Sequence, residues 1–172
     1  GLNLPIDKSR PAIQTYNGAS INFDLSPELT RQIQQLAVDN NATLYMTLLA
    51  AFQVLLYRYT GQEDILVGSA TAGRLKPKFR NIVGYFVNPV VLRGDLSNNP
   101  NFKDFLSQIR QTVIEALTHQ DYPFASLVEK LQPNRNLSYS PIFQVSFALN
   151  QLQKSQETQR FSPNQIRENI NW

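Results

Sequence analysis

Two apolar segments that lie close together in the sequence constrain the fold most strongly. Residues 44–59 are apolar with few polar interruptions, and they are shorter than the ~20 apolar residues that a membrane span requires. They therefore predict a helix buried on nearly every side, capped by Thr43 and ended by Gly61. Residues 64–70 form a short, continuously apolar run, which predicts a central strand covered on both faces. Together the two segments favour an α/β architecture, a layered sheet with packed helices.

The flanking segments predict the other elements of that layered fold. Ile21, Phe23 and Leu25 alternate with polar residues, which is the period of a half-buried strand. Ser26 followed by Pro27 is typical of a helix start. The remaining patterns predict helices at residues 26–40, 101–118 and 123–131 and strands at residues 82–95 and 142–149. We divide the chain into an extended linker at residues 1–16, a folded lobe at 17–150, and a polar tail at 151–172 that we expect to be mobile.

Length and composition limit the class of protein. The 172 residues suffice for one domain or one lobe of a larger domain. The sequence has no cysteine and one histidine, so no metal site is expected. A net charge of +3 is too small to indicate a nucleic-acid partner. The first residues contain no secretory signal, and we expect a cytoplasmic protein that makes no membrane contact.

The run from Ile82 to Arg93 carries one polar residue among apolar neighbours. Gly84 permits a close backbone approach or an unusual φ, and the following residues, Phe86 among them, are typical of a strand. An unpaired buried amide costs about 1–3 kcal/mol, so Asn88 must either bond to backbone at a turn or face a cavity. Local chemistry favours the turn, and both interpretations stay open.

Two further groups of residues could carry chemistry. Four cations at Arg74, Lys76, Lys78 and Arg80 alternate with other residues. They predict a solvated loop or a contact for an anionic group, such as the phosphate of a prosthetic arm. His119 is the one imidazole, at the expected end of a long helix, where a structural role fits.

Five short segments stand out together, at residues 4–11, 67–74, 83–93, 119–124 and 135–143. In this order they resemble an LPTDRPRP linker, an (I/V)G-x-x-x-AGR segment, an (I/V)G-x-FVN-T-x-x-x-R motif, an (H/N)QD-(Y/V)-PFE motif and an RD-x-SRNPL motif. These are the motifs of the condensation domains of nonribosomal peptide synthetases, which the chain resembles. The chain departs from the family pattern at the motif ends, with Pro89, Ala125, Asn136, Tyr139 and Ser140 in place of the usual residues.

The resemblance implies the C-terminal lobe of a two-lobed fold similar to chloramphenicol acetyltransferase. The family's reaction is acyl transfer, in which two substrates tethered to carrier proteins by phosphopantetheine arms are joined through an amide. No cofactor would be bound directly. The implied partners are an N-terminal condensation lobe, peptidyl or acyl carrier proteins and adjacent synthetase domains. The family's HH-x-x-x-DG motif is absent, so no catalytic residue is assigned to this chain.

The resemblance also assigns residues to roles. Gly84, Phe86 and Asn88 would lie on the substrate tunnel between the lobes, and the loop at residues 73–81 would bridge toward the partner lobe. For Arg93 we expect an ion pair that is at least half-buried, for example with Asp95 or Asp121. A capping role is expected for Asp121, with Pro123 as the first helical residue. The residues expected to be structural are Arg93, His119, Gln120, Asp121, Pro123, Phe124, Arg135, Ser138 and Pro141.

Three functions remain open at this point. The first is a condensation lobe that is inactive without its partner lobe. The second is a non-catalytic module that binds a carrier or a neighbouring synthetase domain. The third is an ester-forming acyltransferase of the same superfamily. The first hypothesis adds one structural expectation, since a lobe separated from its partner leaves apolar surface exposed.

Overall fold

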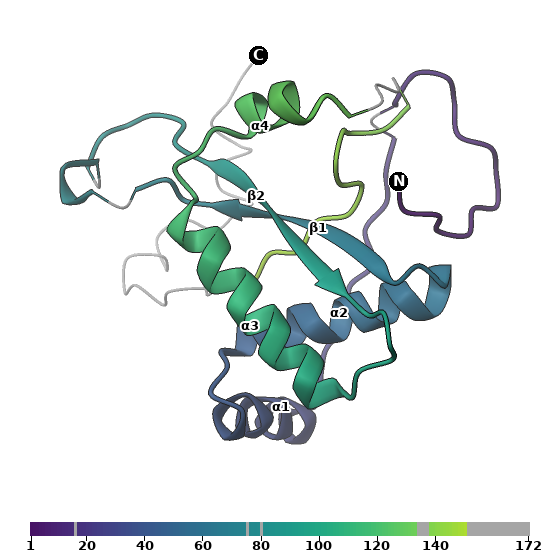
Figure 1. The fold of residues 1–172 in the computed structure, drawn as a ribbon, viewed down its shortest axis with the longest axis vertical. Coiled ribbons are helices and arrows are strands. Elements are labelled where there is room, and N and C mark those ends of the chain that lie inside the picture. The colour runs from purple at the N-terminus through teal and green to yellow at the C-terminus, as the bar shows by residue number, and fades with distance from the viewer. Residues whose placement is uncertain (16, 75, 80, 134–137, 151–172) are drawn as a thin grey trace, which may run out of the picture.

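The computed structural model describes residues 1–15, 17–74, 76–79, 81–133 and 138–150. The described part of the chain forms two strands, four α-helices and one short 3₁₀ turn (Figure 1). Arg80, Arg135 and the tail at residues 151–172, which the sequence analysis singled out, lie outside the described residues. The elements in chain order are α1 (Pro27–Asp39), α2 (Leu44–Thr60), β1 (Asp64–Thr71), the 3₁₀ turn η1 (Pro77–Phe79), β2 (Asn88–Asp95), α3 (Phe102–Thr118) and α4 (Phe124–Leu131).

The two strands form an antiparallel pair whose register runs from Asp64 opposite Asp95 to Thr71 opposite Asn88. A third segment lies along the other edge of β1, where Gly68 forms a parallel bridge with Ser146. Gly68 N donates to Val145 O at 2.9 Å, and Phe147 N donates to Gly68 O at 2.9 Å. The layer of strands therefore joins the middle and the end of the described chain.

Helices α2 and α3 pack against one face of this layer, and α1 packs on α2 (Figure 1). Leu49 of α2, Phe105 of α3 and Ile65 of β1 are at most 1% exposed. Burying a side chain of this size contributes roughly 1.5–3 kcal/mol, so the contact of the two helices with the strands is the main source of stability. The buried core comprises Met46, Leu49, Ala50, Leu56, Ile65, Val67, Leu92, Leu96, Phe105, Leu106, Ile109 and Val113.

The predicted starts of α1 and α2 are confirmed because their causes are local. The Ser26 hydroxyl accepts from Leu29 N at 3.1 Å, and Pro27 is the first residue of α1. The Thr43 hydroxyl accepts from Met46 N at 3.2 Å. Gly61 ends α2 with a left-handed φ of 67°. These caps supply hydrogen-bond partners for the backbone groups at the helix ends, so no tertiary neighbour is needed for that purpose.

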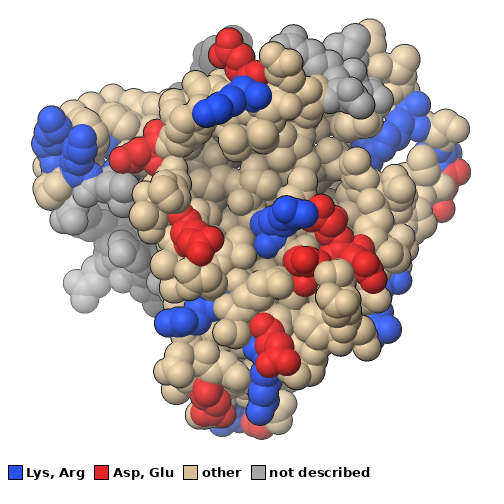
Figure 2. Space-filling model, viewed as in Figure 1, with Lys and Arg blue, Asp and Glu red and all other residues tan. Residues whose placement is uncertain are grey.

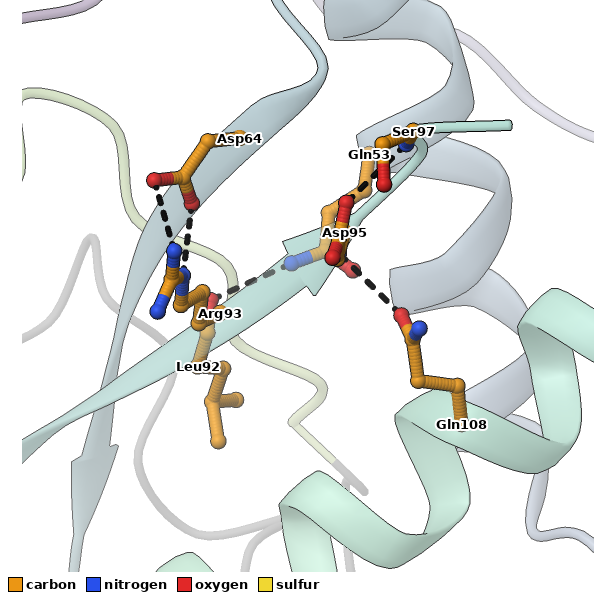
Figure 3. Close-up of polar contacts among 7 residues, drawn as sticks. All are labelled: Gln53, Asp64, Leu92, Arg93, Asp95, Ser97 and Gln108. Carbon is orange, nitrogen blue, oxygen red and sulfur yellow. Dashed lines mark hydrogen bonds and ion pairs between the residues drawn. The ribbon is translucent and has the colours of Figure 1, made fainter. Parts of the chain in front are cut away.

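The predicted burial of α2 is only partly correct. One stripe of the helix stays uncovered, with Leu55 50% and Tyr59 65% exposed. The opposite side is in the core, where Gln53 is fully buried and its Nε2 donates to Leu92 O at 3.1 Å (Figure 3). Its Oε1 has no hydrogen-bond partner among the described residues, so the one bond from Nε2 is what ties α2 to the middle of β2.

The strand prediction for residues 19–25 is wrong. This segment contains no strand, and Ile21 and Phe23 are 88% and 81% exposed. A period of two makes a strand only when a neighbouring strand accepts its backbone hydrogen bonds. None of the described residues does so here. The alternation therefore leaves two large apolar side chains at the surface.

Two other strand predictions need correction. The strand expected from Ile82 begins only at Asn88, because the pairing with β1 ends at Thr71. The preceding residues leave the sheet and turn outward (Figure 1). The strand expected at residues 142–149 is reduced to the single bridge at Ser146. In both cases pairing decides where the strand is.

Candidate functional site

Asn88 joins the start of β2 to the connection between α3 and α4. Its Nδ2 donates to Gln120 O and to Tyr122 O, each at 2.8 Å. Its Oδ1 accepts from Phe124 N at 3.0 Å. Both amide hydrogens are thus used, and the first turn of α4 receives a cap from a residue 36 positions earlier. Of the two interpretations left open, bonding to backbone is the one the structure shows, and a tunnel-facing role for Asn88 stays a prediction.

The connection between α3 and α4 is held at several points. His119 N donates to Glu115 O at 3.1 Å, so His119 does end α3. Gln120 is 8% exposed, and its Nε2 donates to Leu117 O at 2.7 Å. The capping role expected for Asp121 is wrong, since α4 begins after Pro123 with no side-chain cap of its own. Asn88 takes that place from outside the local sequence.

The last described motif packs onto the same region. The rings of Phe124 and Phe143 lie 5.4 Å apart between centroids. Phe143 also covers Gly68, where an added Cβ would lie 2.2 Å from the ring. Pro141 O accepts from Phe143 N at 2.8 Å, and Ser138, at the start of this stretch, interacts with another residue. Segments of four motifs therefore meet around Asn88 and Phe143.

Residues 72–87 connect β1 to β2 and leave the sheet (Figure 1). We call this segment the arm. Arg74 organises the arm from within: its guanidinium donates to Phe79 O, to Ile82 O at 2.8 Å and to Gly84 O at 3.0 Å. It also lies 4.3 Å above the ring of Phe86. These bonds occupy the guanidinium, so Arg74 is a structural residue in the arm.

A glycine is required in the arm at Gly73, whereas Gly84 shows neither a left-handed φ nor a close contact with backbone. Gly73 has a left-handed φ of 62°, and an added Cβ would lie 1.9 Å from Phe86 O. At Gly84 the nearest contact of a Cβ would be the Phe86 ring at 3.3 Å, with no left-handed φ. Only Gly73 therefore meets both conditions that exclude a side chain.

The outer surface of the arm combines apolar and cationic side chains. Val83 is fully exposed and Tyr85 is 86% exposed. Lys76 and Lys78 are exposed too, with Lys78 Nζ 5.3 Å from the ring centroid of Phe79. Figure 2 shows basic side chains grouped at the outer end of the arm. Together with Ile21 and Phe23, Val83 and Tyr85 are the most exposed large apolar side chains among the described residues.

The ion pair of Arg93 differs from the prediction in partner and in burial. Arg93 Nε and Nη2 donate to the two carboxylate oxygens of Asp64 at 2.8 and 3.1 Å (Figure 3). The register places Asp64 diagonally across the pair from Arg93, on the same face. Both side chains are more than half exposed, at 66% and 56%, so the pair contributes little to stability. Hydrogen bonding to Asp64 raises the pKa of Arg93.

Asp95, one of the two partners expected for Arg93, makes a turn instead. Its Oδ1 accepts from Ser97 N at 2.9 Å, and its own N donates to Gln108 Oε1 at 3.1 Å (Figure 3). Hydrogen bonding from Ser97 lowers the pKa of the Asp95 carboxyl. The two ends of β2 are therefore fixed in different ways, by Asn88 at one end and by an exposed turn at the other.

A cavity of about 380 Å³ lies between the strands, the start of α2 and the end of α3. Its walls are mainly apolar, with Val90, Leu92 and Val113 among them, and Gln120 of the α3–α4 connection lies at its edge. No charged residue is among the described residues that line it. A volume of this size matches small-molecule sites, which span roughly 300–1,000 Å³.

Two of the polar groups at this cavity, the hydroxyls of Tyr45 and Ser69, form a chain of hydrogen bonds. Tyr45 Oη donates to Ser69 Oγ at 2.7 Å, and Ser69 Oγ donates to Phe147 O at 3.0 Å. Burial raises the pKa of Tyr45, so its hydroxyl stays protonated at neutral pH. Within the described residues there is no group of three His, Cys, Asp or Glu side chains that could hold a metal. The cavity is suited to holding an apolar group, with no Asp, Glu, His, Lys or Arg in its described lining.

Comparisons with known proteins identify the family of this chain. The family model of the condensation domain matches residues 1–171. The chain belongs to the condensation domain family. It is 53% identical over 152 residues to one of the linear gramicidin synthase proteins of Brevibacillus parabrevis, covering 88% of this chain and 3% of that protein. It is 46% identical over 148 residues to tyrocidine synthase 3 of the same organism, covering 86% of this chain and 2% of that protein.

Solved structures agree with this membership. A four-domain nonribosomal peptide synthetase bound to AMP and glycine matches with a TM-score of 0.87 at 30% identity, covering 90% of this chain and 12% of that chain. The X-domain from teicoplanin biosynthesis matches with a TM-score of 0.80 at 27% identity, covering 84% of this chain and 32% of that one. The predicted family and the layered α/β fold are confirmed. The chain spans only a small part of these proteins.

Within the part of the chain that the structure describes, no helix is long and apolar enough to cross a membrane.

Proposed function

We propose that this condensation-family chain acts as a C-terminal lobe that helps to join two carrier-tethered thioesters through an amide bond. The observation that carries the proposal is the convergence of four motif segments around Asn88 and Phe143, beside an uncharged cavity. In the reaction, an amine nitrogen attacks a thioester carbonyl, the N–C bond forms and the C–S bond breaks. The amine loses a proton and the leaving sulfur gains one.

The contribution of this chain is positioning. The described lining of the cavity contains no Asp, Glu, His, Lys or Arg to move a proton. The family's active-site motif, HH-x-x-x-DG, is absent from this sequence. Two reactants held in a correct geometry gain a large part of the rate without any acid or base. A connection held by Asn88 keeps one wall of such a site in place.

The exposed arm supports a partner lobe as the complement of this chain. Val83 and Tyr85 are almost entirely exposed on a loop that Arg74 holds in a fixed shape. Ordered apolar side chains at a surface are typical of an interface. We propose that the arm reaches toward the N-terminal lobe and that the complete domain works with carrier proteins in the cytoplasm.

The test is complementation. The chain alone should form no amide from an aminoacyl donor and an aminoacyl acceptor on their carriers, and an N-terminal lobe added in trans should restore turnover. His119→Ala should leave the restored rate within about twofold, because His119 lies at a helix end outside the cavity. Turnover by the lone chain that disappears in His119→Ala would refute the proposal. Ester formation with a hydroxyl acceptor in the same assay would favour the ester-forming alternative.

A second candidate function is a non-catalytic interaction module. One solved relative, the X-domain from teicoplanin biosynthesis, is described in complex with OxyB, at 27% identity and a TM-score of 0.80. Lys76 and Lys78 offer this chain an exposed cationic contact. Binding of a carrier protein that weakens steeply between low and high salt would favour this function. Carrier binding that does not change with salt would count against it.

A further inference from the structure

The cavity beside Asn88 has the properties of a side-chain pocket. Val90 and Leu92 of β2 form one wall, and Val113 and Ala116 of α3 form the facing wall. The cavity opens to solvent near Leu117, which is 45% exposed. It is therefore a recess with an apolar floor and an entrance, unlike a closed packing defect in the core.

The polar groups around this recess leave little for a charged ligand to bind. The hydroxyls of Tyr45 and Ser69 are used in the chain of bonds that ends at Phe147 O. No Lys, Arg, His, Asp or Glu is among its described lining residues. An ionised group placed there would lose its hydration without gaining a counter-charge, which is strongly unfavourable. Apolar groups carry no such penalty.

Two amide side chains, Gln120 and Asn150, are among the lining residues, and Gln120 is the buried one. Gln120 is more than nine-tenths buried, and its Nε2 is used by Leu117 O. Its Oε1 accepts no hydrogen bond from any residue that the structure describes. An N–H group of a ligand at the cavity edge could donate to this oxygen. The combination of an apolar recess with an adjacent acceptor matches an aminoacyl group, which carries a nitrogen one bond from the base of its side chain.

We infer that this recess receives the apolar side chain of one of the two aminoacyl substrates and selects against charged side chains. The inference rests on the proposed function and adds to it the class of substrate. The donor and the acceptor are both aminoacyl thioesters, so the side chain of either fits this description. The second experiment below measures the two substrates separately. Ala116 sets the free volume, because its methyl group is small and it stands on the wall opposite β2.

The first experiment measures binding to the chain itself, without catalysis. Leucine and glutamate, each as the N-butyl amide, are titrated while the ¹³C-methyl signals of Val90, Leu92 and Val113 are followed by NMR. The leucine amide should shift these signals and bind at least tenfold more tightly than the glutamate amide. Equal affinities, or shifts confined to other methyl groups, overturn the inference.

Two variants with matched controls test the site. Ala116→Leu should fill the recess and weaken the leucine amide at least tenfold, whereas Ala125→Leu, at an exposed position of α4, should leave binding unchanged. Leu117→Asp should weaken leucine binding through a charge at the entrance. Leu55→Asp, 50% exposed on α2, is its control. Each variant is first checked by thermal unfolding, and if Ala116→Leu does not fold, Leu117→Asp decides. Unchanged leucine binding in a folded site variant overturns the inference.

The second experiment separates this inference from the proposed function. With an N-terminal lobe present, kcat/KM is compared for leucine, alanine and glutamate on the donor carrier, then on the acceptor carrier. A preference for leucine on one carrier that Ala116→Leu shifts at least tenfold toward alanine assigns the recess to that substrate. Amide formation with no side-chain preference on either carrier overturns the inference and leaves the proposed function intact. Failure to form an amide from any pair refutes the proposed function, while the NMR result still stands for the recess.

Discussion

Asn88 and Arg74 each bind three backbone groups, but the segments that they hold are very different. Asn88 bonds to residues 32 to 36 positions away and joins β2 to the α3–α4 connection. Arg74 bonds to carbonyls only 5 to 10 positions away and closes the arm on itself. Asn88 therefore stabilises the tertiary structure, whereas Arg74 fixes the shape of one surface loop. Similar sets of hydrogen bonds can thus serve a fold in one place and an exposed surface in another.

The largest effect should come from Asn88→Asp. The carboxylate keeps an acceptor for Phe124 N but loses both donors, so Gln120 O and Tyr122 O lose their partners. We expect a loss of about 3 kcal/mol in the free energy of unfolding, measured by urea denaturation. Asn98→Asp, at an exposed position, is the control. A loss below about 1 kcal/mol would show that the connection between α3 and α4 does not depend on Asn88.

A smaller but clear loss is expected for Gly73→Ala at the base of the arm. The added Cβ would collide with Phe86 O at 1.9 Å, and alanine would have to keep a φ of 62°. The cost should be about 2 kcal/mol of unfolding free energy, or the arm should rearrange. Gly18→Ala is a matched control, because nothing lies within 4 Å of the position that its methyl group would take. Equal stability of both variants, with unchanged amide hydrogen exchange in the arm, would contradict the requirement for glycine at position 73.

Arg74→Lys should separate local order from global stability. The ammonium retains the charge but cannot reach three carbonyls in a planar fork. Unfolding free energy should change by less than about 1 kcal/mol, while amide hydrogen exchange in residues 76–87 should accelerate at least tenfold. Complementation by an N-terminal lobe should weaken as well. A stability loss as large as that of Asn88→Asp would show that the arm belongs to the cooperative core.

The smallest effect concerns Asp95, at the exposed end of β2. Hydrogen bonds from Ser97 lower the pKa of its carboxyl in the folded state. The stabilisation is therefore present above the pKa of the unfolded state, and it is lost as the pH falls through the folded-state pKa. Asp95→Asn should flatten the acid limb of the stability curve slightly, as measured by thermal unfolding between pH 2 and 6. A wild-type acid limb identical to that of the variant would contradict this.

Local chemistry explains which parts of the fold could be predicted. The Ser26 and Thr43 caps and the left-handed Gly61 depend on residues within one helical turn, and the structure has them as expected. The strand prediction for residues 19–25 was wrong because alternating apolar residues do not show whether a neighbouring strand is present to pair with them. The predicted ion-pair partner of Arg93 was wrong for a related reason. Asp64 is 29 positions away in sequence, and only the strand register brings it close.

The candidate site divides in the same way. Sequence motifs identified the family and marked Asn88 as an amide that needs partners. They did not reveal that Asn88 caps α4, because Phe124 lies 36 residues away and the amide had several ways to be satisfied. The uncharged recess was not predicted at all, since its walls come from four separate elements. Gln120 lines the recess, and its motif had predicted only a structural role for it.

The sequence by itself determined the four helices, the caps of α1 and α2, the strand β1 and the membership in the condensation family, since these follow from short-range periodicity, capping and motif order. Tertiary structure decided where β2 begins, which carboxylate Arg93 meets, which glycine the arm requires and where the cavity lies. Those features arise from contacts between residues far apart in the chain. Their energies depend on a register and a packing geometry that no local pattern specifies.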